Sequence, residues 1–162
     1  MSIDDAKSRT PLKPVVRSAR QQDYAAWKPL WDGYNAFYGR TDETALSNEI
    51  TQATWQRFFD PHEPVFALVA EHDGALVGLS HYLLHRSTIR IEPTCYLADL
   101  FTLESVRGRG IGRSLINAVY ERARSDGAYR VYWMTHESNA PGRLLYDQVA
   151  QDSGFIVYTK NL

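Results

Sequence analysis

The strongest chemical signal in the sequence is a short stretch, RGRGIGR at residues 107–113, in which glycine alternates with arginine. It lies between a strand-like run and a helix-like run, so unpaired backbone N–H groups at the helix start can converge on one anion. The helix dipole adds roughly half a positive charge at that end. Residues 107–124 contain five arginines and one acid, Glu121, in a chain of net charge −1. The stretch therefore predicts a phosphate-binding loop.

Glycine spacing distinguishes the known kinds of phosphate-binding loop. A Walker-type loop requires lysine and then serine or threonine after its last glycine, whereas Gly112 is followed by Arg113. A dinucleotide fingerprint, Gly-x-Gly-x-x-Gly, started at Gly108 or at Gly110 meets arginine or leucine at its third glycine position. Both kinds are excluded. The spacing that fits is Arg-x-x-Gly-x-Gly, formed by Arg107, Gly110 and Gly112.

Apolar periodicity predicts the elements that must position this loop, in the order β-α-α-β-β-β-α-β-α-β. Strands are expected at residues 15–19, 65–71, 75–85, 95–102, 131–135 and 155–159. Helices are expected at residues 111–127 and 141–150, along the aromatic stripe from Trp27 to Tyr38, and from Thr41 or Asp42 to Asp60.

Single residues refine these boundaries. Pro29 predicts that the first helix kinks there or starts close to it, and Gly39 is expected to end that helix. Asp73 and Gly74 stand between two apolar runs, which is a pattern typical of a β-hairpin.

With these elements in place, the sequence resembles the GNAT superfamily of acetyl-CoA-dependent N-acetyltransferases, whose pyrophosphate-binding motif is Gln/Arg-x-x-Gly-x-Gly/Ala. Asn139, followed seven residues later by Tyr146 in NAPGRLLYDQVA, is similar to the second cofactor and catalytic helix of that family. The runs EPVFALVAEHDG, LADLF, RVYWMTHESN and RLLYDQVA resemble small members related to histone acetyltransferases. The resemblance covers most of the chain and implies the GNAT fold, an α/β (α+β) architecture with a mixed central sheet and flanking helices.

The resemblance implies direct transfer of an acetyl group from acetyl-CoA to a primary amine of a small cationic metabolite, which is polyamine-like, an amino acid or aminoglycoside-like. A protein lysine acetyltransferase and a non-catalytic CoA-binding sensor stay open as alternatives. The expected cofactor contacts lie at the end of one strand, in the glycine loop and on the later helix: Leu100, Phe101, Thr102, Leu103, Arg107, Gly108, Arg109, Gly110, Ile111, Gly112, Arg113, Ser114, Asn139, Arg143 and Tyr146.

Tyr146 and Asp99 are the expected catalytic residues. A tyrosine with an ordinary pKa of about 10 stays protonated at neutral pH, so Tyr146 can donate to the departing sulfur. CYLADLF resembles the Leu-Glu-Asp-Phe-Phe run of spermidine/spermine acetyltransferases, with Ala98 in place of a glutamate implicated in accepting the substrate proton. Strand alternation places Ala98 and Asp99 on opposite faces. Asp99 is therefore a candidate base, directly or through water, with His81, His85, His136 and Glu137 as alternatives.

Tyr34, Tyr38, His81 and Glu137 are expected to contact the acceptor amine. The first two helices form the substrate wall in the family, and residues 41–73 carry seven acids against Arg57 alone, which favours a cationic acceptor. His81 and His85 share a strand face without an acidic or cysteine partner, so no metal site is expected.

Composition sets the remaining expectations. The 162 residues fit one domain, expected at 15–162 after a flexible arm at 1–14. Near-neutral charge argues against a nucleic-acid partner, and no apolar run is long enough to cross a membrane. The single cysteine, Cys95, suits a reducing, cytoplasmic compartment. Little sequence follows the expected strand at 155–159, so an open sheet edge is expected, which a second subunit covers in a homodimer.

Overall fold

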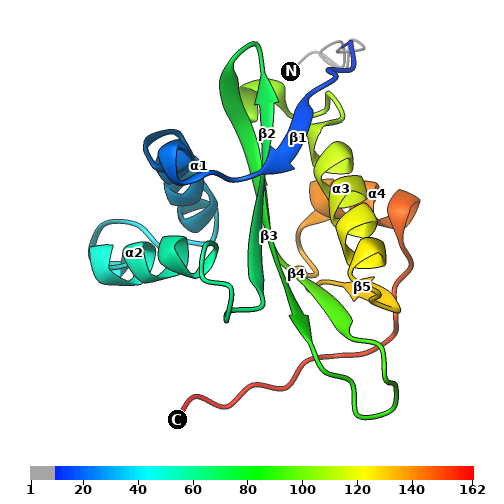
Figure 1. The fold of residues 1–162 in the computed structure, drawn as a ribbon. Helices are drawn as coiled ribbons and strands as arrows, with labels where there is room; N and C mark the ends of the chain where they lie inside the picture. The colour runs from blue at the N-terminus through cyan, green and yellow to red at the C-terminus, as the bar shows by residue number, and fades with distance from the viewer. Residues whose placement is uncertain (1–9) are drawn as a thin grey trace.

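The computed structural model describes residues 10–162 and shows one five-stranded sheet with helices on both faces (Figure 1). The strands follow the chain order across the sheet: β1 (Val15–Ser18), β2 (Val65–His72), β3 (Ala75–His85), β4 (Thr94–Thr102) and β5 (Arg130–Tyr132). Neighbours from β1 to β4 are antiparallel, whereas β5 runs parallel to β4. The expected mixed sheet is therefore confirmed.

Each face of the sheet has its own apolar core. Helices α1 (Tyr24–Phe37) and α2 (Asn48–Arg57) cover one face, and α3 (Ile111–Ser125) and α4 (Ala140–Val149) lie on the other (Figure 1). On the first face Trp27, Trp31 and Trp55 pack against β2 and β3. On the second face Leu115 and Val119 of α3 are fully buried against the sheet. The 3.6-residue apolar period of α3 explains this burial, because it places one stripe of the helix toward the strands.

The β2–β3 hairpin forms where the sequence predicts it. Asp73 and Gly74 both have positive φ, 50° and 76°, as the tight turn between twisted antiparallel strands requires. The turn fixes the register of β2 against β3, in which Ala67 lies opposite His81.

Strand β4 carries two irregularities that shape the candidate site. The β3–β4 register shifts so that His81 pairs with Asp99 while Tyr82 pairs with Leu97, which leaves Ala98 as a bulge residue. On its other side, β4 pairs with β5 only over Thr94–Tyr96, and beyond that point the two strands separate. The edge of β4 from residue 97 onward therefore faces no strand within the described residues.

Four local predictions need correction. Helix α1 begins at Tyr24 and contains Pro29, so the expected start close to Pro29 is wrong, whereas the expected kink there stays a prediction. Helix α2 begins after Ser47, whose hydroxyl accepts from the Ile50 N–H, because residues 42–44 form a separate 3₁₀ turn instead. Strand β5 ends at Tyr132.

The expected strand at 155–159 is the fourth correction, because this segment has no secondary structure in the described chain. A strand forms only where a neighbouring strand supplies hydrogen bonds, and here none is beside it.

Candidate functional site

The glycine loop presents backbone N–H groups at the start of α3. Gly108 and Gly110 have φ values of 72° and 89°, a left-handed conformation that side chains disfavour, and Gly110 is the N-cap of α3. The first hydrogen bond of the helix runs from the Ser114 N–H to the Gly110 carbonyl, at 3.0 Å. Within the described chain, the N–H groups of residues 111–113 therefore have no acceptor.

Space around the loop matches a phosphate. A Cβ added at Gly108 or Gly110 would meet no atom within 4 Å, so both glycines border open space. A Cβ at Gly112 would lie 3.3 Å from Leu145 Cδ2, which shows that this glycine lets α4 pack closely against α3. Open space in front of unpaired amides, at the positive end of a helix, fits the diphosphate of coenzyme A.

The arginines around the loop are tied to neighbouring segments. Arg107 Nε donates to the Thr102 carbonyl at 3.2 Å, and Arg113 hydrogen-bonds Gln148 of α4. Arg109 Nε donates to the Thr10 carbonyl at 3.1 Å, while the Leu12 N–H donates to the Arg109 carbonyl at 2.9 Å. Residues 10–12 of the expected arm thus contact the loop, and residues 1–9 lie outside the described residues.

The segment expected to contact pantetheine follows the bulge. Leu100, Phe101 and Thr102 lie on the part of β4 that has separated from β5. On its other side, the segment stays joined to β3, because the Leu103 N–H donates to the Val77 carbonyl at 2.9 Å. The unpaired edge of β4 on the β5 side therefore covers residues 97–102.

The bulge at Ala98 decides what Asp99 faces. Cys95 and Leu97 belong to the core on the α3 side, whereas Phe101 packs into the core on the α1 side. Strict alternation would keep residues 97, 99 and 101 on one face, but the extra residue moves Asp99 to the α1 side, opposite His81. The same shift places Tyr96 and Asp99 on a common face.

A buried histidine, His81, holds Asp99, and a tryptophan determines which ring nitrogen of this histidine carries the proton. Trp27 Nε1 lies 3.0 Å from His81 Nε2, and His81 Nδ1 lies 2.9 Å from Asp99 Oδ2. An indole N–H can only donate, so His81 Nε2 must accept and Nδ1 must carry the proton that it donates to Asp99. His81 is only 2 % exposed, so it positions Asp99 and does not line the acceptor surface.

Tyr34 of α1 and Tyr38, which directly follows this helix, lie near Asp99. Burial raises the pKa of Tyr34, and the charge of Asp99 and a hydrogen bond to it raise this pKa further. Burial and then Asp99 also raise the pKa of Tyr38 and of Tyr96. Three phenols that stay protonated therefore lie near one carboxylate, and the expected role of Tyr34 and Tyr38 in acceptor binding stays a prediction.

A guanidinium lies over the rings of the same two tyrosines. Arg40 is half-buried, with its Cζ 5.9 Å from the Tyr34 ring centre and 5.5 Å from that of Tyr38. Its Nε donates to Asn35 Oδ1 at 2.7 Å, and Asn35 is itself anchored by the Trp31 carbonyl. No acid forms an ion pair with Arg40 within the described residues. The site thus contains the Asp99 carboxylate and the Arg40 guanidinium, which forms no ion pair within the described residues, and both groups lie beside Tyr34 and Tyr38.

Tyr146 of α4 approaches the site from the other face of the sheet. Its ring packs edge-on against Trp133, with ring centres 5.4 Å apart. Burial raises the pKa of Tyr146, and Tyr38 contributes a smaller effect in the same direction, so the two hydroxyls are close enough to interact. Tyr146 therefore stays protonated and can donate a proton.

The remaining expected residues have mainly structural contacts. Asn139 caps α4, because its Oδ1 accepts from the Gly142 N–H while its Nδ2 donates to Thr135. Arg143 donates to the Glu137 carbonyl at 3.2 Å. The Glu137 side chain is exposed in the turn after β5, and no contact joins it to Asp99 within the described chain. The Ser114 hydroxyl turns back to the Gly110 carbonyl.

Three residues near Asp99 are not among those expected from the sequence: Arg40, Tyr96 and Tyr132. Arg40 does carry a signal, because it is a basic residue standing directly between the aromatic stripe of α1 and the acidic stretch that follows. Tyr132 accepts or donates a 3.0 Å hydrogen bond with His85 Nε2 and packs on Tyr96, with ring centres 5.0 Å apart. The two tyrosines lie opposite each other where β4 and β5 pair, and no sequence pattern marks this parallel pairing.

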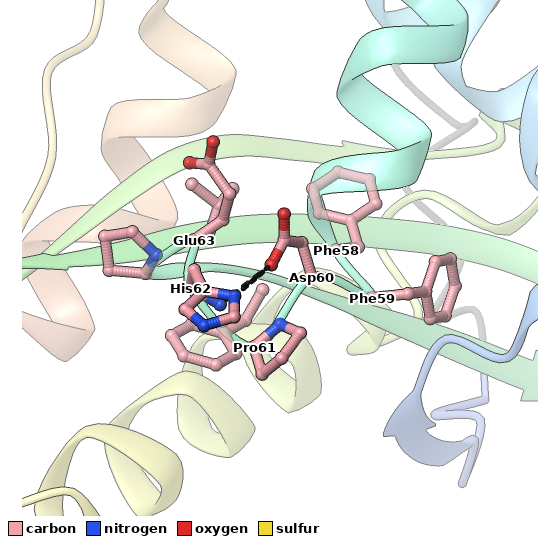
Figure 2. Close-up of a pocket in the computed structure, with 9 residues that line it drawn as sticks. Phe58, Phe59, Asp60, Pro61, His62 and Glu63 are labelled. Atoms are coloured by element: carbon pink, nitrogen blue, oxygen red, sulfur yellow. Dashed lines mark hydrogen bonds and ion pairs between the residues drawn. The ribbon is translucent and has the colours of Figure 1, made fainter.

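A hollow of ≈ 410 Å³ lies elsewhere, in the loop between α2 and β2 (Figure 2). Figure 2 shows Asp60 directed at His62, and the His62 Nδ1 to Asp60 Oδ1 distance is 3.2 Å. Glu63 is 4.0 Å from Arg57. None of the glycine-loop residues or of the tyrosines around Asp99 lines this hollow, so it is separate from the candidate site.

Comparisons with known proteins agree on one family. Residues 27–150 match the model of the acetyltransferase (GNAT) family. The chain is 32 % identical to the D-amino-acid N-acetyltransferase HPA3 of Saccharomyces cerevisiae, over 99 % of both chains.

Solved structures show the same fold. An aminoglycoside acetyltransferase from an uncultured soil metagenomic sample superposes with a TM-score of 0.79 at 18 % identity, covering 93 % of this chain and 99 % of its own. AAC(6')-Iy, in complex with the bisubstrate analogue CoA-S-monomethyl-acetylneamine, superposes with a TM-score of 0.78 at 15 % identity over the same shares. Across the described residues, every helix is too short or too polar to span a bilayer.

Proposed function

The chain belongs to the acetyltransferase (GNAT) family and is an N-acetyltransferase, and from this premise we propose that it acetylates the amino group of an amino acid or a similar small zwitterion. The observation that carries the proposal is that an acidic group, Asp99, and a basic group, Arg40, both lie beside Tyr34 and Tyr38. A similar protein is named for D-amino acids, which is consistent with this acceptor class.

Acetyl-CoA is the proposed co-substrate, and it supplies an acetyl group activated as a thioester. The N–H groups of residues 111–113 would hold its diphosphate, because they are unpaired and border open space. The unpaired edge of β4 at residues 97–102 would hold the amide groups of pantetheine by backbone hydrogen bonds. With the cofactor bound in this way, its acetyl group would lie close to Asp99.

Asp99 and Arg40 would hold the two charged ends of the acceptor. The Asp99 carboxylate binds the ammonium group and takes its proton, directly or through one water, so that the amine becomes a nucleophile. The Arg40 fork binds the acceptor carboxylate, for which a guanidinium has matching geometry. Tyr34 and Tyr38 pack on the atoms between these ends and exclude water.

Tyr146 would complete the proton balance. The neutral amine forms a C–N bond as the C–S bond breaks, the departing sulfur takes one proton, and the nitrogen gives up a second proton, which replaces the one that the donor to sulfur has lost. Tyr146 is held protonated by burial and lies across the sheet from Tyr38, so its hydroxyl is the proposed donor. The reaction then yields an N-acetylated acceptor and the free thiol of CoA.

The experiment that tests this proposal follows release of the CoA thiol with pairs of acceptors that differ in one group. An amino acid is compared with its amide, which keeps the amine and lacks the carboxylate. We expect the amide to lose at least tenfold in kcat/KM, because an ion pair with Arg40 is missing. Equal kcat/KM values for the amino acid and its amide would refute the proposal that the acceptor is a zwitterion.

Two variants of Arg40 make the assignment specific. Arg40→Gln should raise KM for the amino acid while leaving the amide unchanged, and Arg40→Lys should restore part of the loss. Lys28→Gln is the matched control, because Lys28 lies on the same helix and pairs with Asp32 instead. A loss with amide and acid alike would point to a structural role for Arg40.

A second candidate acceptor is a small polycation such as an aminoglycoside. The observation in its favour is the acidic stretch 41–73, whose excess negative charge lies in the segment joining α1 to β3. Aminoglycosides, polyamines and basic peptides therefore belong in the same panel. We also propose a cytoplasmic location, where acetyl-CoA is made and a free buried thiol such as Cys95 persists.

A further inference from the structure

The hydrogen bonds that join Trp27, His81 and Asp99 determine more than the position of the carboxylate. Trp27 is completely buried and His81 is 2 % exposed, so bulk water reaches neither side chain. The His81 ring lies against Trp31 and Phe58, with ring centres 5.1 Å and 4.5 Å away. Both nitrogens of the imidazole are therefore directed at protein groups, Nε2 at the Trp27 indole and Nδ1 at Asp99.

This arrangement leaves no place for a second proton on His81. A charged imidazolium carries a hydrogen on each ring nitrogen. At Nε2 that hydrogen would point into the 3.0 Å gap that the indole N–H of Trp27 already fills, so two donors would face each other without an acceptor. A buried donor without a partner is costly, above all on a charged group. Trp27 therefore opposes a protonation of His81 that the nearby carboxylate would favour.

The charge state of His81 decides how much negative charge Asp99 offers to an acceptor. A neutral His81 donates one hydrogen bond and leaves the carboxylate with its full charge. An imidazolium would form an ion pair whose total charge is zero, which would weaken the attraction for an ammonium group and make the carboxylate a weaker base. A neutral histidine therefore suits both tasks proposed for Asp99.

We propose that Trp27 is a positioning residue that keeps His81 neutral, so that the Asp99 carboxylate keeps its negative charge for the acceptor amine. The task of Asp99 rests on the proposed function, whereas the state of His81 does not. His81 carries a proton on Nδ1 and has a blocked Nε2, so it cannot take the proton of the amine itself. It is thereby removed from the alternatives to Asp99 as the base.

The other ionisable groups beside this pair, among the described residues, keep one charge state near neutral pH. The phenols stay protonated, because burial and then the charge of Asp99 raise the pKa of Tyr34, Tyr38 and Tyr96. The Arg40 guanidinium keeps its positive charge throughout. A change in activity between pH 6 and pH 8 that depends on Trp27 can therefore be assigned to His81 and Asp99.

Nitrogen NMR of the full chain, without any acceptor, measures the state of His81 directly. The shifts of the ring nitrogens distinguish a neutral imidazole with its proton on Nδ1 from an imidazolium, and the signals lost in His81→Gln identify this ring among the five histidines. We expect the wild-type ring to stay neutral from pH 8 to pH 6. Trp27→Phe keeps an aromatic ring but removes the donor, so His81 should take a second proton over this range.

An imidazolium in the wild type at pH 6, or a ring that stays neutral in Trp27→Phe, would overturn the proposal. The wild-type titration decides the charge of His81 even where Trp27→Phe does not fold. Thermal melting of each variant, with and without acetyl-CoA, reports folding separately.

The pH dependence of kcat/KM with an amino acid acceptor tests the consequence for Asp99. An imidazole with an ordinary pKa of about 6.5 is roughly three-quarters protonated at pH 6 and about 3 % protonated at pH 8. The ratio of wild-type to Trp27→Phe kcat/KM should therefore rise at least threefold from pH 8 to pH 6. Trp55→Phe is the matched control, because its ring centre lies 4.7 Å from that of Trp27 in the same core and its contacts to His81 include no hydrogen bond within the described residues.

A double variant separates the charge at position 81 from damage to the core. Glutamine presents one acceptor and one donor, as the neutral imidazole does, and cannot take a second proton. Trp27→Phe combined with His81→Gln should therefore lose the dependence on pH, although its core lacks the same indole. A ratio that still rises toward pH 6 in the double variant would overturn the proposal. A constant ratio in Trp27→Phe, with the imidazolium present by NMR, would instead count against Asp99 as the group that binds the amine.

Discussion

Replacing Asp99 by asparagine tests the proposed chemistry most directly. The amide oxygen of the new side chain can still accept the proton of His81 Nδ1, which now lies 2.9 Å from Asp99 Oδ2, so the network to Trp27 stays intact. The variant loses the negative charge that binds an ammonium group and takes its proton. General base catalysis contributes roughly 10²–10⁴-fold, and we expect kcat/KM to fall by that factor at pH 7. This factor corresponds to about 2.7–5.5 kcal/mol of transition-state stabilisation.

The pH dependence of this loss separates base catalysis from damage to the fold. As pH rises toward the pKa of the acceptor amine, more of the amine is already neutral and the base is needed less. The deficit of Asp99→Asn should therefore shrink at alkaline pH, in an assay of CoA thiol release with an amino acid acceptor. Asp32→Asn is the control, because Asp32 lies on the exposed side of α1 and pairs with Lys28.

Two results would refute the reasoning. One is a rate for Asp99→Asn within about threefold of wild type at pH 7, which leaves no room for the smallest general-base contribution. The other is a loss that stays constant from pH 7 to pH 10 while acetyl-CoA still raises the melting temperature as in wild type. That outcome would assign Asp99 to binding alone.

Three further predictions concern the cofactor slot, the proton donor and the buried thiol. Gly110→Asp forces a side chain into a φ of 89° and places a negative charge at the unpaired amides, so calorimetry should show acetyl-CoA binding weakened at least tenfold, and unchanged affinity would show that the loop is misassigned. Tyr146→Phe should lower kcat by roughly 10²-fold or more with little change in acetyl-CoA affinity, and an unchanged kcat would remove Tyr146 from the mechanism. Burial raises the pKa of Cys95 from 9.0 to about 12, so the folded state keeps a proton that the unfolded chain loses. Stability should then fall by about 1.4 kcal/mol per pH unit from this thiol between pH 9 and pH 12, and urea titrations of Cys95→Ala should lack that component.

The parts of the fold that could be predicted from the sequence are those that depend on local patterns. The Asp73–Gly74 hairpin follows from two residues that tolerate positive φ, and both have it. The start of α3 follows from glycines that precede a strong helical stripe, and Gly110 is its N-cap. In these segments, neighbouring residues alone determine the conformation.

The parts that could not be predicted depend on partners far along the chain. Nothing near Ala98 marks it as a bulge, because the extra residue exists only relative to the register of β3. Trp27 and His81 are 54 residues apart, so their hydrogen bond leaves no sequence pattern. Without the bulge, alternation still separates Ala98 from Asp99 but places Asp99 on the same face as Leu97, away from the tyrosines of α1.

The expected strand at 155–159 failed for a related reason. Its residues favour a strand, but strand formation needs an adjacent edge, and the described chain brings no edge to it. The predicted start of α2 was wrong because two residues are good helix caps. Thr41 caps the 3₁₀ turn at 42–44, and Ser47 caps α2 itself.

The side chains and the main chain of β4 have separate roles in the proposed recognition. This separation affects how the preference for an acceptor can change. In the proposed mechanism, its side chains on the α1 face would contact the acceptor, whereas its separated edge would offer only main-chain atoms to pantetheine. Main-chain atoms are the same for every amino acid. Under that proposal, substitutions at Tyr34, Tyr38 or Arg40 would change the preferred amine and leave the contacts to the acyl donor unchanged.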